Sequence, residues 1–136
     1  MTILILKVGD AKDSLNQIAG DYLKRLKQPF RVNVNSIKSE KLLLLSKNFY
    51  RIVLDENGEQ LTSKEFSKTL EKLTNRGEKI AFLIGGALGH NEEVLKSANK
   101  TIALSKMTLP HRLAFCLLAE QIYRAQEIAH NGPYHK

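Results

Sequence analysis

The sequence predicts an α/β protein with a mostly parallel sheet and helices on both of its faces, in a single domain over residues 1–136. Two observations carry this class. Apolar runs typical of buried strands, at residues 2–8, 49–54 and 80–84, alternate along the chain with longer segments of helical periodicity. A chain of 136 residues is also long enough for one hydrophobic core and too short for two ordinary ones.

The first part of the chain predicts a strand, a helix and a second strand. Residues 2–8 are an almost unbroken apolar run that ends at Gly9, and they lack the basic leader and cleavage site of a signal peptide, so we expect a buried parallel strand. An amphipathic helix follows from Asp13 and stops before Pro29. In residues 30–37 apolar and polar positions alternate, which predicts a strand at the edge of the sheet.

The middle of the chain combines an ambiguous segment with clear signals. Residues 38–48 contain four consecutive leucines without a clear period, and we expect either a short helix or an interface segment. Residues 49–54 predict a strand that ends in a turn at residues 55–59, because Asp, Asn and Gly favour turns. Thr62 and Glu65 have the spacing of a capping box, which predicts the start of a helix.

The last part of the chain predicts two strands, each followed by a loop and a helix. Residues 80–84 are the strongest parallel-strand signal and run directly into a glycine-rich loop at residues 85–89. A helix capped near Asn91 and a short strand at residues 101–104 come next. The final helix, at about residues 110–129, is apolar nearly all round in its first half, so we expect it to form a subunit interface as well as to cover the sheet.

The composition limits the partners and the compartment. Lys and Arg exceed Asp and Glu by 7, which favours a polyanionic partner, although a merely basic surface is an alternative. No apolar run reaches the roughly 18 residues that a membrane helix needs, so we expect no membrane association. Cys116 is the single cysteine and lies in an apolar run; we expect a buried thiol, no cysteine-rich metal site and a reducing, cytoplasmic location.

Two loops after two strands carry the functional signal. Residues 85–89 bring bare backbone close to the space beyond a strand end, because glycine has no side chain to block approach. The loop has neither the glycine spacing of dinucleotide folds nor the lysine of a P-loop, and its GXXG pattern follows a strand, unlike that of KH modules. A plain tight turn remains the alternative. The second loop, residues 104–111, adds hydroxyls, a thioether and a proline, and the pair is more specific than either loop.

Nearly the whole chain resembles one known family. The segments that carry the resemblance are residues 8–9, 84–86 with Gly89, 104–111, 120–125 and 133–136. Together they resemble the ribosomal large-subunit methyltransferases that modify N3 of a pseudouridine in helix sixty-nine of 23S rRNA, within the SPOUT superfamily. The resemblance implies an α/β knot, in which the last strands and helix form a deep trefoil knot, an exception to the rule that chains avoid threading.

The resemblance also implies a cofactor and the residues that hold it. S-adenosylmethionine is expected to bind in a bent form against the end of one strand, the glycine turn and the loop before the last helix. The corresponding residues here are Leu54, Gly85, Leu104, Ser105, Lys106, Met107, Thr108 and Leu109. Backbone groups in these loops would bind the adenine, and apolar side chains would pack on it.

Four side chains are candidates for holding the target base or easing the loss of its N3 proton: His111, Arg124, Tyr134 and His135. Each has a simpler explanation. His111 can make a hydrogen bond at the start of a helix, Arg124 can pair with Glu120 at i,i+4, and the last residues can be a frayed tail. We favour a tail that RNA or a partner subunit orders.

The chain departs from the family in one place. The segment at residues 38–48 is shorter than in the family pattern and lacks most of a helix and a basic loop. This difference puts the binding and selection of the RNA substrate in doubt more than it does the cofactor loops. We expect a homodimer that acts on the assembled ribosome without a metal. The alternatives are a SPOUT enzyme with another rRNA or tRNA target, and a non-catalytic RNA-binding module.

Overall fold

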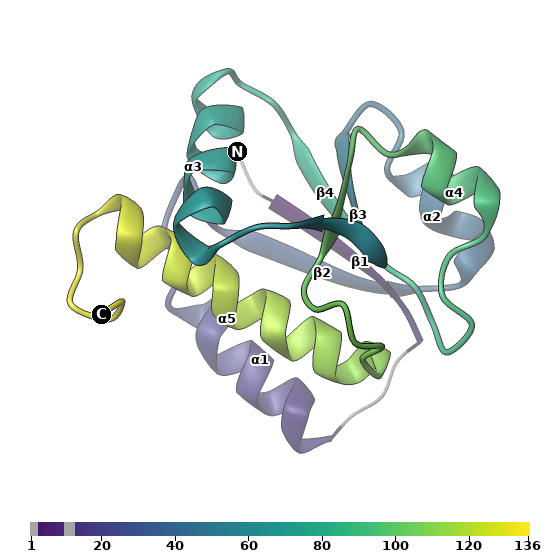
Figure 1. Ribbon diagram of the computed structural model, residues 1–136, viewed down its shortest axis with the longest axis horizontal. Helices are drawn as coiled ribbons and strands as arrows, with labels where there is room; N and C mark the ends of the chain where they lie inside the picture. The colour runs from purple at the N-terminus through teal and green to yellow at the C-terminus, as the bar shows by residue number, and fades with distance from the viewer. Residues whose placement is uncertain (1–2, 10–12) are drawn as a thin grey trace.

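The computed structural model describes residues 3–9 and 13–136, and it contains a five-stranded sheet in the order β2-β1-β4-β3-β5 (Figure 1). The strands are β1 (Ile3–Val8), β2 (Val32–Ile37), β3 (Tyr50–Gln60), β4 (Ile80–Ile84) and β5 (Lys100–Ala103). All four pairings between neighbouring strands are parallel, so the predicted parallel sheet is confirmed. As expected, β2 lies at an edge, and β1 lies between two other strands.

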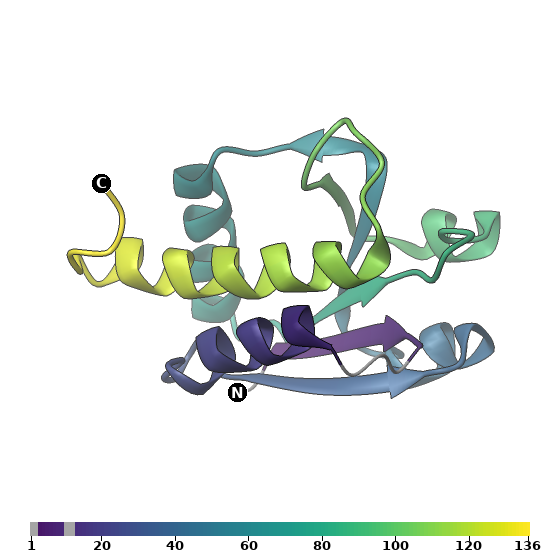
Figure 2. The same cartoon turned by 90° about the horizontal axis from the view of Figure 1, so that it is seen from below.

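Helices cover both faces of the sheet. The three longer ones are α1 (Ser14–Lys24), α3 (Ser63–Asn75) and α5 (His111–Ala129), and α5 packs against both α1 and α3. In both views α1 and α5 run side by side (Figure 1, Figure 2). The other face carries the one-turn 3-10 helix η1 (Ser39–Lys41) with the short helices α2 (Leu42–Leu45) and α4 (Glu92–Ser97). Among the described residues, no helix is long and apolar enough to cross a membrane.

Strand β4 divides the core into its two layers. Ile80, Phe82 and Ile84 belong to the larger cluster, on the face of α1, α3 and α5. Ala81 and Leu83 belong to the smaller cluster, which includes one buried residue each from α2 and α4. Successive side chains of a strand point to opposite faces, so an apolar residue at every position requires cover on both sides. All five residues of β4 are buried.

The helix starts follow the sequence signals. The Asp13 carboxylate accepts from the backbone amide of Asn16 at 2.9 Å at the start of α1. Before α3 the Thr62 hydroxyl accepts from the amide of Glu65 at 3.1 Å, and the Glu65 carboxylate accepts from the amide of Thr62 at 2.8 Å. The Asn91 side chain caps α4 in the same way. Each cap gives a partner to an amide that the first turn of a helix leaves free.

The predicted turn at residues 55–59 is wrong, because β3 continues to Gln60. The register of its pairing with β5 shifts between Leu54 and Glu59, so the extra residues form an irregularity inside the strand rather than its end. Gly58 lies where a Cβ would stand 2.8 Å from the backbone of Ile102. The glycine that we took as a turn signal therefore permits a close approach between two strands.

The ambiguous segment after β2 forms η1 and α2, which confirms a short helix. Leu42 is buried in the smaller cluster, whereas Leu44 and Leu45 are exposed. The Arg51 guanidinium in β3 holds this segment, since Nη2 donates to the Leu43 carbonyl at 3.0 Å and Nε donates to Ser46 Oγ at 2.7 Å. A compact connection thus joins the edge strand β2 to the interior strand β3.

The capping box before α3 gives the first prediction. Replacing Thr62→Ala removes the acceptor for the Glu65 amide, and we expect the free energy of unfolding to fall by about 1 kcal/mol. Urea denaturation of the wild type and the variant measures the difference. The matched control is Thr69→Ala in the same helix, whose hydroxyl donates only to the Glu65 carbonyl one turn back. A loss in Thr69→Ala as large as that in Thr62→Ala would contradict the cap's contribution.

Candidate functional site

A pocket opens at the carboxyl ends of β4 and β5, where parallel α/β sheets place their ligands, and beside residues 54–56 of β3. Its volume is about 150 Å³, or about 670 Å³ when the open solvent at its mouth is included. Its walls come from the middle of β3, the glycine turn after β4, the loop before α5 and the first turn of α5. The lining residues are Leu54, Asp55, Glu56, Ile84, Gly85, Gly86, Ala87, Gly89, His90, Leu104, Ser105, Met107, Thr108, Leu109, His111 and Ala114.

The glycine turn is closed by backbone contacts. The Gly89 amide donates to the Gly86 carbonyl at 2.9 Å, and Gly89 adopts a positive φ of 73°. A Cβ on Gly85 would stand 2.8 Å from the carbonyl carbon of Gly89, closer than real side chains come. The two ends of the turn therefore meet backbone to backbone, with no side chain between Gly85 and Gly89. The turn presents its main chain to the pocket.

The loop before α5 is tied to the extended end of β3. The Thr108 hydroxyl donates to the Glu56 carboxylate, and the Met107 amide donates to Ser105 Oγ at 3.0 Å. Glu56 is in this position because β3 continues beyond the point where we predicted a turn. With Asp55 it adds two carboxylates to the pocket of a chain whose net charge is +7.

His90 is a pocket residue that the sequence interpretation missed. Its Nε2 lies 3.0 Å from the Leu83 carbonyl, and its buried Nδ1 has no hydrogen-bond partner among the residues that the structure describes. Burial lowers the pKa of His90, against the opposing effects of the Leu83 carbonyl and Asp55. A neutral ring that donates from Nε2 to Leu83 leaves Nδ1 as a free acceptor beside the pocket. Its place directly after the glycine turn was the signal that could have revealed it.

Of the four candidates for acting on the target base, His111 alone lines this pocket. It is the first residue of α5, and its Nε2 lies 3.9 Å from where a Cβ on Gly9 would stand. Gly9, directly after β1, is thus a neighbour of the imidazole, and a Cβ there would make ordinary contact with the ring. Arg112, the next residue, pairs with Asp13 at 2.9 Å and ties the start of α5 to the start of α1.

Arg124, Tyr134 and His135 form a separate cluster on α5. Arg124 Nη2 pairs with the Glu120 carboxylate at 2.8 Å, and its Nη1 donates to His135 Nδ1 at 2.9 Å. The Tyr134 hydroxyl donates to Glu120 at 2.7 Å, and its ring packs edge-on against Tyr123. Burial, followed by bonds to Tyr22 and Glu120, raises the pKa of Tyr134.

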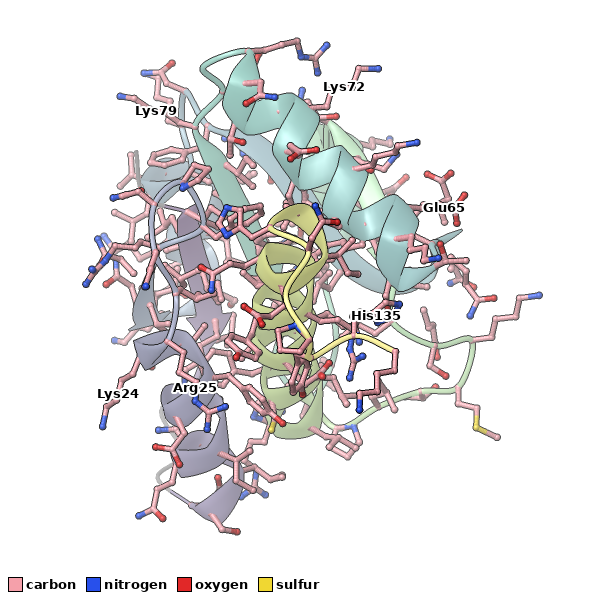
Figure 3. All side chains as sticks on the ribbon, turned by 90° about the vertical axis from the view of Figure 1, so that its left-hand side faces the viewer. Lys24, Arg25, Glu65, Lys72, Lys79 and His135 are labelled. Atoms are coloured by element: carbon pink, nitrogen blue, oxygen red, sulfur yellow. The ribbon has the colours of Figure 1, made fainter. Side chains whose placement is uncertain are left out.

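The tail is therefore ordered by its own helix. Figure 3 shows it folding back on α5 with His135 against the helix. Arg124 lies 13 residues after His111, which is about 20 Å along an α-helix, so the cluster and the pocket are far apart within one chain. The ion pair with Glu120, weighed above as the simpler explanation of Arg124, is present.

A family model described as "Predicted SPOUT methyltransferase" matches residues 1–135. The chain is also 39% identical to "Ribosomal RNA large subunit methyltransferase H" of Exiguobacterium sp., with 100% of each chain covered. The chain belongs to the SPOUT methyltransferase family. The alignment with that relative spans 159 positions, more than the 136 residues present here, so the relative carries segments that this SPOUT member lacks.

Solved structures support the same fold. A "probable methylase family protein" from Haemophilus influenzae Rd KW20 superimposes with a TM-score of 0.65 at 13% identity, over 98% of this chain and 70% of the other. The SpoU methyltransferase AviRb from Streptomyces viridochromogenes, in complex with AdoMet, gives 0.50 at 12% identity, over 94% of this chain and 58% of the other. The expected α/β-knot fold of the SPOUT class is confirmed.

The fold brings most of the expected cofactor residues to one place. Seven of the eight line the pocket of this SPOUT protein, and the exception is Lys106, whose side chain is exposed and absent from the lining. Asp55, Glu56, His90 and Ala114 line it without having been expected. Within residues 3–9 and 13–136, no three His, Cys, Asp or Glu side chains gather as a metal site.

The lowered pKa of His90 gives a prediction on pH dependence. At pH values between the lowered pKa of the folded state and the ordinary histidine pKa of about 6.5, the unfolded chain binds more protons than the folded chain. The free energy of unfolding must therefore fall as the pH is lowered through this window. In His90→Gln we expect the free energy of unfolding to fall less steeply with pH, because Gln does not titrate but keeps a donor for the Leu83 carbonyl. The two slopes should differ by no more than about 1.4 kcal/mol per pH unit.

Urea unfolding at a series of pH values from 7.5 to about 5.5 measures this difference. Glu65 does not interfere, because its pKa is lowered from an ordinary value that already lies below the window. If the free energy of unfolding changed with pH in the same way in the wild type and in His90→Gln, His90 would have the same pKa in the folded and the unfolded chain, and the prediction would be wrong.

Proposed function

We propose that this protein uses S-adenosylmethionine to methylate N3 of a pseudouridine in helix sixty-nine of the 23S ribosomal RNA, in the assembled ribosome. The observation that carries the proposal is the meeting of β3, the glycine turn and the loop before α5 in one pocket, with bare backbone where Gly85 meets Gly89. Membership of the SPOUT methyltransferase family and a relative named for large-subunit ribosomal RNA support the reaction and the kind of substrate.

The residues of the pocket fit that cofactor. Leu54, Ile84 and Leu104 provide apolar surface for an adenine ring. The carboxylates of Asp55 and Glu56 provide negative charge near a ligand that carries a sulfonium and an ammonium group. The unpartnered Nδ1 of His90 can accept from a ligand donor once the turn adjusts.

The cofactor supplies an activated methyl group, so the protein's own task is to place the target base and help its N3 proton to leave. His111 is suited to act on the base because it lies on the pocket wall at the start of α5. The pairing of Arg112 with Asp13 holds the helix start on which His111 lies. Preorganised side chains of this kind act by orientation and charge.

The surface supports contact with RNA phosphates. Basic residues dominate the net charge, and Lys24, Lys72 and Lys79 point outward at the end of the molecule where the tail lies (Figure 3). Arg25 stacks over the rings of Tyr22 and Tyr123 at 5.6 and 5.5 Å, which keeps its guanidinium at that surface. Such contacts would hold the RNA without reading its sequence.

We further propose a homodimer in the cytoplasm. Part of α5 and α1 is uncovered within one chain, since Leu117 is 39% exposed and Ile18 45% exposed. Arg124, Tyr134 and His135 lie about 20 Å along α5 from the pocket of their own chain. They could therefore act on a base only at the pocket of a second copy, or by binding another part of the same RNA. Analytical ultracentrifugation tests the dimer.

The glycine turn gives a prediction on cofactor binding. In Gly85→Ala the new methyl group would press on the Gly89 backbone, so the turn must open, and we expect the affinity for S-adenosylmethionine to fall at least about tenfold. The control is Gly20→Ala in α1, where no described part of the chain lies within 4 Å of the new Cβ, and this variant should bind as the wild type does. Titration calorimetry measures both.

Failure of the wild-type protein to bind S-adenosylmethionine would overturn the proposed function. Equal binding by Gly85→Ala and the wild type would remove the glycine turn from the site while leaving the reaction standing. Mapping the methylated nucleotide in ribosomes from a strain without the enzyme identifies the target.

The tail gives a prediction on turnover. Deleting residues 134–136 should abolish methylation of ribosomes and leave cofactor affinity within about twofold, because the tail cluster lies away from the pocket of its own chain. Deleting Lys136 alone keeps Tyr134 and His135 in place and should retain activity. Unchanged turnover after the longer deletion would refute a role for the tail.

A further inference from the structure

Two exposed apolar side chains flank the candidate pocket. Leu88 is 100% exposed and Met107 is 78% exposed, which are the highest values among the large apolar residues that the structure describes. Single exposed apolar residues are common and need no explanation. These two, however, lie on the two loops that form the pocket walls: Leu88 stands between the lining residues Ala87 and Gly89, and Met107 lines the pocket itself.

Leu88 projects from a braced turn. The turn closes through the hydrogen bond from the Gly89 amide to the Gly86 carbonyl, and Gly85 packs directly on the Gly89 backbone. The structure therefore holds an apolar side chain in water, between two residues that line the pocket.

The surroundings favour a nucleobase as the group that covers Leu88. The chain has a net charge of +7, and Lys106, next to Met107 in the opposite loop, is exposed and suited to a phosphate. A base that enters a pocket for reaction must leave its stack, and this exposes the flat faces of its neighbours. Apolar side chains inserted beside unstacked bases are a common way to cover such faces.

We propose that Leu88 packs against the nucleobase next to the target base and fills the position in the stack that the target base leaves. Met107 covers the other side of the pocket opening. This inference rests on the proposed function and adds a positioning residue to it. Leu88 acts on the RNA and not on the cofactor, so its loss should separate the two binding events.

The first test compares Leu88→Ala with Leu44→Ala, a control that removes another leucine, which lies on α2, is 61% exposed and does not line the pocket. In Leu88→Ala we expect kcat/KM for ribosomes to fall by about tenfold or more, with the affinity for S-adenosylmethionine and the Tm unchanged. Leu88→Phe, which keeps an apolar group, should recover most of the loss. Leu44→Ala should match the wild type in every measurement.

The second test identifies the partner directly. A photoreactive p-benzoylphenylalanine replaces Leu88 in one variant and Leu44 in the other, and each is irradiated with ribosomes. We expect a cross-link from position 88 to a nucleotide adjacent to the methylated one, found as a stop in reverse transcription, and none there from position 44. A cross-link from position 88 to a ribosomal protein or to a second copy of the chain would overturn the proposal.

The outcomes separate this inference from the proposed function. Wild-type kcat/KM in Leu88→Ala, or a loss confined to cofactor affinity, would overturn the role of Leu88 while the methyltransferase assignment stands. A wild-type protein that neither binds S-adenosylmethionine nor methylates ribosomes would overturn both.

Discussion

The burial of β4 on both faces is the constraint on which the rest of the structure depends. An interior parallel strand without polar side chains is stable only between two layers of helices, so the larger layer of α1, α3 and α5 and the smaller layer of α2 and α4 both follow from it. The same strand ends at Ile84, and Gly85 begins the glycine turn directly after it. The core therefore determines where the glycine turn emerges, and with it the location of the pocket.

The pocket combines irregular loops with support from the buried strands. The glycine turn has no side chains at its narrowest point, where Gly85 meets Gly89, and the loop before α5 is tied to β3 through Thr108 and Glu56. Beneath both loops lie buried strand residues, so the loops can differ in chemistry without losing their position. This arrangement suits a family in which one fold serves several targets.

Helix α5 separates two groups of functional candidates. Its first turn brings His111 to the pocket, and its second half gathers Arg124 with Tyr134 and His135 around Glu120. One helix thus holds both groups at a constant distance, and a second subunit or the RNA substrate must bridge that distance if both act on one base. The exposed Leu88 adds a third position, at the rim of the pocket.

From the sequence alone, much of this protein could be predicted, because strands, helix caps and glycine loops depend on neighbouring residues. Thr62 with Glu65, and the apolar run of β4, behave as local patterns indicate, and the resemblance to the SPOUT family named the pocket loops. The extension of β3 could not be predicted: Gly58 favours a turn locally, and only the approach of β5 makes it part of a strand. The isolation of His90 Nδ1 and the distance of the tail from the pocket were also decided by tertiary structure, because burial and long-range contacts join residues that no local pattern relates.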